Sequence, residues 1–219
     1  STIIDSINYA TEVINNNNLD KSKVVINMSL GGPYSQGLEE AVRNAADQGI
    51  RFSISAGNNM ADADTISPAS AGDHQNVYTV SAVDSNYNTA WWSNYDNDTG
   101  AEDDVDVSAP GVSVLSYYQG GNLAFLDGTS MAAPHVAGLL LLGDVRKGDM
   151  AGKNGFGYSD PFALIDKSLL NTNETGDTTP PTIAISANSS SLIVGETALI
   201  SFALSEDSSD FTLADISVS

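Results

Sequence analysis

Hydrophobic residues recur at two different spacings along the first 142 residues of the chain. Apolar side chains three or four positions apart predict an amphipathic helix at its beginning, capped by Ser1 or Thr2. The mostly apolar segment Val24–Met28 predicts instead a fully buried strand, as parallel sheets contain. The apolar positions of this first helix are Ile3, Ile4, Ile7, Ala10, Val13 and Ile14.

The alternation of helix and strand patterns continues along the chain. A second helix is predicted at Ser35–Gly49, followed by strands at Ile50–Ala56 and Asn76–Val83. The charge-free run Met131–Leu142 is too short for a membrane span, which takes about 20 apolar residues, so we expect a helix buried against the sheet. This succession predicts an α/β fold with a doubly wound, mostly parallel sheet.

Composition narrows the classes of partner. With 219 residues, the chain can bury one sizeable core and form a small further module. Its 28 Asp and Glu residues against 8 Lys and Arg give a net charge of −20, which argues against nucleic acid or an anionic membrane as partner. The absence of cysteine excludes disulfides, thiol catalysis and Cys-ligated zinc. No apolar run predicts membrane insertion, and no signal peptide is present in this sequence, which begins at Ser1.

Ser130 is the first candidate for chemistry, because it follows Gly128 and Thr129 at the head of the apolar helix. Backbone N–H groups in a first helical turn have no intrahelical partner, and the partial positive charge there favours a developing oxyanion. Pro134 lacks an N–H group and should leave a carbonyl near the helix start unpaired, with a kink. A structural helix cap is the alternative role for Ser130, and on these local features alone it is the commoner one.

Neither of the two histidines is placed as a base for Ser130. His135 follows Ser130 by five positions, which puts the two side chains about 140° apart around a helix axis, so His135 points away. His74 lies in a polar segment between Asn58 and Ser130, where a solvated loop histidine is the expected role.

Four segments of the sequence change the interpretation of Ser130. The eleven residues Gly128–Gly138 (GTSMAAPHVAG) resemble the nucleophile motif of the subtilisin-like serine peptidases, or subtilases, at every fixed position. Val24–Gly32 (VVINMSLGG) resembles the strand that lines the family's substrate cleft, and Ser55–Asn58 (SAGN) resembles the turn with its oxyanion-hole asparagine. Asp106–Gly111 (DVSAPG) also fits, and the resemblance covers roughly residues 1–142.

The resemblance implies a secreted, extracellular serine endopeptidase that forms an acyl-enzyme on Ser130. Asn58 would donate to the oxyanion, and an extended peptide would pair with residues 29–31 as an added strand. We expect peptide or protein substrates, no required cofactor and a monomer. Taken alone, the two loop segments are equally well explained as a Gly-Pro turn and an Asn-rich turn. The candidate substrate-binding residues are Ser29, Leu30, Gly31, Ala56, Gly57 and Thr129.

The acid and the base of the family's triad have no counterpart in this sequence. Subtilases carry Asp, His and Ser in that order, with the histidine in a His-Gly-Thr motif, and no His-Gly pair occurs here. We therefore expect a fragment, the C-terminal part of a catalytic domain with its Asp and His upstream of residue 1. A catalytically inactive homologue that serves as a binding scaffold, and a cell-surface adhesion or binding module, remain the alternatives.

The pattern changes after residue 142. We assign residues 1–170 to the catalytic domain, the Pro-containing polar segment 171–182 to a linker, and 183–219 to the first part of a bacterial immunoglobulin-like sandwich, because apolar residues there alternate with a period of two. Residues 155–165 are expected to form the catalytic domain's closing turn and helix. The acidic segment Asp96–Asp104 is compatible with a structural Ca²⁺, although a solvated loop is favoured because the EF-hand pattern is absent.

Overall fold

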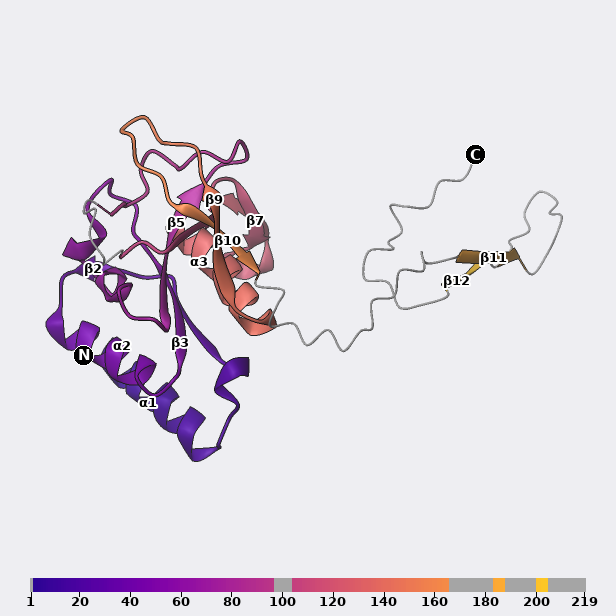
Figure 1. Ribbon diagram of the computed structural model, residues 1–219. Coiled ribbons are helices and arrows are strands. Elements are labelled where there is room, and N and C mark those ends of the chain that lie inside the picture. Colours follow the sequence, from indigo (N-terminus) through magenta and orange to yellow (C-terminus); the bar gives the residue numbers. More distant parts are fainter. Residues whose placement is uncertain (1, 97–103, 166–182, 188–199, 205–219) are drawn as a thin grey trace. The chain divides into compact units, whose positions relative to one another are not determined.

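The structure, a computed structural model, describes residues 2–96, 104–165, 183–187 and 200–204 (Figure 1). The chain divides into two compact units, Ser1–Asn171 and Thr172–Ser219. The expected linker 171–182 lies outside the described residues, and the limits assigned to the domains stay a prediction.

A six-stranded sheet forms the centre of the first unit, in the order β1-β3-β5-β6-β10-β9. Neighbouring strands are parallel except for the last pair, in which β9 runs antiparallel to β10. The strands are β1 (Val25–Met28), β3 (Arg51–Ser55), β5 (Val77–Val83), β6 (Val107–Pro110), β10 (Pro161–Ile165) and β9 (Val145–Met150).

Helices cover both faces of this sheet. Helices α1 (Thr2–Asn16) and α2 (Gln36–Ala46) lie side by side and share one buried core with Phe52 and Ile54 of β3 (Figure 1). Helix α3 (Thr129–Leu142) packs on the opposite face, against apolar side chains of β5 and β6. This arrangement confirms the predicted doubly wound, mostly parallel α/β fold.

Short elements connect and flank these layers. The two-residue strands β2 (Gly32–Pro33) and β4 (Ile66–Ser67) pair antiparallel, and so do β7 (Val114–Tyr117) and β8 (Leu123–Leu126). Single turns of 3₁₀ helix lie at Lys21–Lys23, Ala63–Thr65, Ala69–Ala71 and Gln119–Gly121. In the second unit, β11 (Ile183–Ala187) pairs antiparallel with β12 (Ile200–Leu204), in agreement with the alternating pattern of the sequence.

Two segments that the sequence indicated as buried are partly exposed. Strand β1 lies at the edge of the sheet, so it has only one described neighbour, and Asn27 is exposed. On α3, His135, Leu141 and Leu142 face solvent, because the sheet covers only one side of this helix. The absence of charge therefore did not mean that the whole helix is buried.

The closing helix expected within residues 155–165 is also not formed. A turn is present, but Pro161–Ile165 is strand β10, which pairs with β9 and, at Phe162, with β6. Its register with β9 shifts between Pro161 and Ala163, a bulge at the start of the strand where the proline has no N–H to give. Because β10 fills the place next to β6, this segment extends the sheet instead of covering it.

The difference in burial along α3 predicts a difference in stability between two leucines. Leu140 is fully buried, and Leu140→Ala should lower the free energy of unfolding by about 2–5 kcal/mol through lost packing and a cavity. Leu142 is 62% exposed, and Leu142→Ala should change the free energy of unfolding by no more than about 0.5 kcal/mol. Urea unfolding of the two variants measures both values, and equal losses would contradict the observed packing of α3.

Candidate active site

Ser130 is the second residue of α3 and is partly accessible to solvent. Its hydroxyl lies 3.4 Å from the carbonyl oxygen of Ser29, a long donor–acceptor distance. Ser29 directly follows β1, so the nucleophile candidate lies at the carboxyl end of the sheet's edge strand. In parallel sheets, ligands bind beyond this end of the strands, which is the position that the sequence indicated.

The carbonyl group of Ser130 has an unusual partner. Because Pro134 has no N–H group, the helical bond that Ser130 would accept from four residues ahead cannot form. The hydroxyl of Ser29 donates to this oxygen instead, at 2.8 Å, and Asn27 donates its amide to the same hydroxyl oxygen at 3.0 Å. The carbonyl that the sequence left unpaired is thus bound to the residue after β1.

Asn58 lies in the turn that follows β3, and its side-chain oxygen faces α3. The backbone N–H and the hydroxyl of Thr129 both donate to Oδ1 of Asn58, each at 2.9 Å. Because a backbone N–H can only donate, this contact fixes which end of the amide is the oxygen. The NH₂ group is therefore the end of the Asn58 side chain that is left to donate to a ligand.

Thr129 also binds the turn before Asn58. Its hydroxyl oxygen accepts a hydrogen bond of 3.0 Å from the backbone N–H of Gly57. Thr129 is fully buried, so both hydroxyl contacts are shielded from water. One side chain thus holds the backbone and the amide oxygen of the same turn.

These residues border one pocket with a volume of about 170 Å³. Six of the eight residues predicted for the site line this pocket. The other two do not: Ser29 lies next to Ser130, whose hydroxyl is near its carbonyl oxygen, and Ala56 is buried. Ser55, Asn59, Gly32 and Ile66 also line the pocket and were not among the predicted site residues. None of the lining residues is charged; they are Leu30, Gly31, Gly32, Ser55, Gly57, Asn58, Asn59, Ile66, Thr129 and Ser130.

Ile66 reaches the pocket through the pairing of β2 with β4. This pairing places Gly32 opposite Ser67, and the Ile66 side chain would lie 3.3 Å from a methyl group added at Gly31. A contact between two segments more than thirty residues apart has no local signal in the sequence. Ile66 therefore narrows the pocket in a way that only the folded chain reveals.

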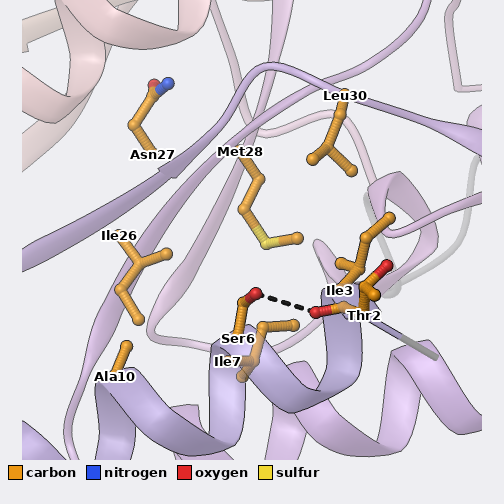
Figure 2. A pocket seen from close by; sticks show the side chains of 9 residues that line it. All are labelled: Thr2, Ile3, Ser6, Ile7, Ala10, Ile26, Asn27, Met28 and Leu30. Atoms are coloured by element: carbon orange, nitrogen blue, oxygen red, sulfur yellow. Dashed lines mark hydrogen bonds between the residues drawn. The ribbon is translucent and has the colours of Figure 1, made fainter.

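Another cavity, of about 310 Å³, lies between α1 and β1 (Figure 2). Ile3, Ile26 and Met28 contribute apolar side chains to it, and the hydroxyl of Ser6 is already bonded to the backbone oxygen of Thr2 at 2.7 Å. The cavity between α1 and β1 could thus hold an apolar group, but its lining supplies no reactive side chain.

Neither histidine is bonded to Ser130. The Nδ1 atom of His135 lies 2.8 Å from the carbonyl oxygen of Met131, one turn earlier on α3. His135 and Ser130 both border a further cavity of about 330 Å³, but no hydrogen bond joins them. The Nε2 atom of His74 lies 3.1 Å from a carboxylate oxygen of Asp47, and its Nδ1 accepts from Asn76.

The described residues contain no group of three or more His, Asp or Glu side chains that would hold a metal ion. The acidic segment Asp96–Asp104 lies outside them apart from its two ends, where the backbone N–H of Asp104 donates to Asp96 at 3.0 Å. A structural Ca²⁺ at this segment stays a prediction. Within the same part of the chain, no helix is long and apolar enough to cross a membrane.

Comparison with known proteins found family matches for both parts of the chain. Residues 1–151 match the model of the subtilase family, and residues 177–219 match that of a bacterial Ig-like domain. Among curated relatives, alkaline protease 1 of Aspergillus flavus is 42% identical over 141 residues, which cover 64% of this chain and 32% of that protein. Proteinase R of Parengyodontium album is 39% identical over 139 residues, covering 64% and 33%.

A solved structure of a cold-adapted subtilisin-like serine proteinase superposes with a TM-score of 0.60 at 29% identity. The superposition covers 74% of this chain and 61% of that one. The match to the curated relatives spans about a third of their length. The resemblance noted from the sequence motifs is thus confirmed, both for the first 151 residues and for the C-terminal module.

The two contacts of the Thr129 hydroxyl predict a test of how firmly the turn is held. Thr129→Val keeps the shape but leaves the partly buried N–H of Gly57 without its acceptor, which should lower the free energy of unfolding by about 1–3 kcal/mol. Thr129→Ser keeps the hydroxyl and is the matched control. Chemical unfolding of both variants measures the difference, and equal stability of the two would show that these bonds do not hold the turn.

Proposed function

The chain belongs to the subtilase family, and from this membership we propose that it forms the nucleophile-bearing part of a secreted serine endopeptidase. One observation carries the proposal: the Ser130 hydroxyl and the Asn58 amide border the same uncharged pocket, with the amide oxygen held by Thr129. A hydroxyl at a helix N-terminus beside a fixed amide donor suits acyl transfer, in which negative charge develops on the substrate's carbonyl oxygen.

In the proposed reaction, Oγ of Ser130 attacks the carbonyl carbon of the scissile peptide bond and gives its proton to a base. The carbonyl oxygen becomes an oxyanion, to which Nδ2 of Asn58 and the backbone N–H of Ser130 donate. The tetrahedral intermediate then expels the amine and leaves an ester on Ser130. Water attacks this ester, releases the carboxylic acid and restores the serine.

The base and the acid of the triad are proposed to come from residues outside this sequence. His135 is engaged with its own helix and His74 with Asp47, so neither is bonded to the Ser130 hydroxyl. An inactive homologue and an adhesion module are the competing functions, but no contact among the described residues favours either. The conserved order of the family's triad favours an upstream His and Asp.

The lining of the pocket supports a class of substrate. A peptide that pairs with the backbone of residues 29–31 would place the side chain before the scissile bond in this pocket. The pocket volume of about 170 Å³ is close to that of an engineered apolar cavity of about 150 Å³ that binds benzene. With no charged group in the lining, we expect uncharged side chains up to the size of leucine or phenylalanine.

The remaining parts of the proposal concern the surroundings of the protein. We propose that it acts outside the cell as a monomer, on peptides or proteins, and that it needs no cofactor for the reaction. Calcium, if bound, would have a structural role. The net charge of −20 supports solubility and is unfavourable for binding nucleic acid.

The absence of a base predicts that this chain alone hydrolyses almost nothing. Loss of the base lowers kcat about a millionfold in subtilisin, and the residual rate comes from the oxyanion hole and binding. The measurement is hydrolysis of a fluorogenic peptide by the purified chain, with Ser130→Ala as the control. Turnover that Ser130→Ala abolishes would show that a base is present and that the proposed location of the triad is wrong.

A second prediction tests Asn58 in a form of the protein that carries the proposed upstream Asp and His. Asn58→Ala should lower kcat about 10²–10³-fold, the magnitude known for the corresponding loss in subtilisin, with KM nearly unchanged, because the bond forms in the transition state. Asn58→Asp should be no better, since a carboxylate cannot donate and repels the oxyanion.

The substrate for this measurement has leucine before the scissile bond, and the same peptide with lysine there should be cleaved more slowly, because the pocket offers no counter-charge. Circular dichroism checks that both variants are folded. A near-normal kcat in Asn58→Ala would reduce Asn58 to a turn residue and remove the basis of the proposed site.

A further inference from the structure

Asn94 is a fully buried amide that lies outside the lining of the active-site pocket. Its side chain nevertheless makes three hydrogen bonds to the turn that carries Asn58. Oδ1 accepts from the backbone N–H groups of Asn59 at 2.9 Å and Ala61 at 3.1 Å, and Nδ2 donates to the carbonyl oxygen of Ala56 at 2.9 Å.

A fourth bond comes from the backbone of Asn94. Its N–H donates to the carbonyl oxygen of Gly57 at 2.9 Å. The four bonds therefore reach residues on both sides of Asn58, although none reaches Asn58 itself. With the turn bound before and after it, the direction in which the Asn58 side chain leaves the backbone is set by Asn94.

Gly57 shows how closely Asn94 approaches this turn. A methyl group added to Gly57 would meet the Nδ2 atom of Asn94, because only a glycine leaves room for the amide. The φ angle of Gly57 is +107°, a conformation that residues with a side chain rarely adopt. The glycine of the Ser-Ala-Gly-Asn segment is thus required by the contact with Asn94 as well as by the turn.

The exposure of Asn58 makes this support necessary. Asn58 is solvent-exposed, and so is Asn59, the residue that follows it in the turn. Thr129 fixes the oxygen of the Asn58 amide, but its hydrogen bonds go to Gly57 and Asn58 and not to the backbone after Asn58. A shift of about 1 Å in a group that stabilises a transition state can cost about 10²-fold in rate.

From this geometry we infer that Asn94 is a positioning residue of the oxyanion hole: it holds the backbone on both sides of Asn58 so that the amide can donate to the oxyanion. The inference rests on the proposed function, because it assigns to Asn94 an effect that acts through Asn58. Asn94 itself contacts neither the substrate nor the reacting atoms.

The test is a double-mutant cycle in the form of the protein that carries the upstream Asp and His. Asn94→Ala should lower kcat about 10–100-fold with little change in KM, since it removes positioning that is needed only in the transition state. In the Asn58→Ala background, the same substitution should lower kcat less than about threefold, because the group that it positions is already absent. Each kcat is expressed per active serine, titrated with an irreversible serine reagent, so that unfolded molecules are not counted.

Asn154 supplies the matched control. It is also a buried asparagine whose Oδ1 accepts two backbone N–H bonds, from Phe156 and Tyr158, in a loop whose residues do not line the active-site pocket. Asn154→Ala should lower the melting temperature but leave kcat per active serine unchanged. Asn94→Ser keeps a hydrogen-bonding oxygen on the side chain without introducing a charge, so it provides the measurement if Asn94→Ala does not fold, with a smaller loss of kcat expected.

Two results would overturn the inference. If both Asn94 variants lower only the melting temperature, as Asn154→Ala should, Asn94 is a structural residue. If Asn94→Ala lowers kcat by the same factor with and without Asn58, it does not act through the amide. A normal kcat in Asn58→Ala alone would overturn the proposed function and this inference together, so the two failures are distinguishable.

Discussion

The missing N–H group of Pro134 is the constraint on which the arrangement of the site depends. It frees the carbonyl oxygen of Ser130, which then accepts from the hydroxyl of Ser29 at the end of β1. One turn of helix is thereby bound to a strand that is 101 residues away in the sequence. A second hydroxyl, that of Ser53 in β3, donates to the carbonyl oxygen of Ala133 at 2.7 Å. Two neighbouring strands thus fix the position of α3 along the sheet.

The turns at the site depend on this position of the helix. With the start of α3 fixed, Thr129 meets the turn after β3, and its hydroxyl accepts from Gly57 while it donates to Asn58. Asn94 holds the same turn from the other side. The exposed end of the site is therefore supported by two fully buried polar side chains, whose bonds do not compete with water. Buried hydrogen bonds behind an exposed side chain allow the Asn58 amide to stay accessible and still keep one orientation.

The sequence predicted those features that depend on neighbouring residues or on a run of matching motif positions. Local signals were enough to predict α1 and the buried strands β3 and β5. They also placed Ser130 shortly after Gly128 at the start of a helix, and Asn58 after Gly57 at the end of a strand. The exposure of β1 and Leu142 had no such local signal, because the burial of an element depends on which other elements pack against it. The helix expected within residues 155–165 came from the resemblance to the family, whereas the strand β10 found there is decided by its pairing with β6 and β9. The roles of Ile66 and Asn94 require contacts that span tens of residues.

The distribution of charge completes the physical account of the site. The chain has a net charge of −20, yet none of the side chains that line the pocket is charged. The nearest carboxylate in sequence, Asp127, accepts from the backbone N–H of Ser113 at 2.6 Å and does not line the pocket. Two unit negative charges about 4 Å apart repel by about 4 kcal/mol at an effective dielectric constant of about 20, which corresponds to about a thousandfold in rate. The uncharged lining of the pocket, with Asp127 bonded to the backbone of Ser113, is therefore compatible with the oxyanion chemistry proposed for Ser130.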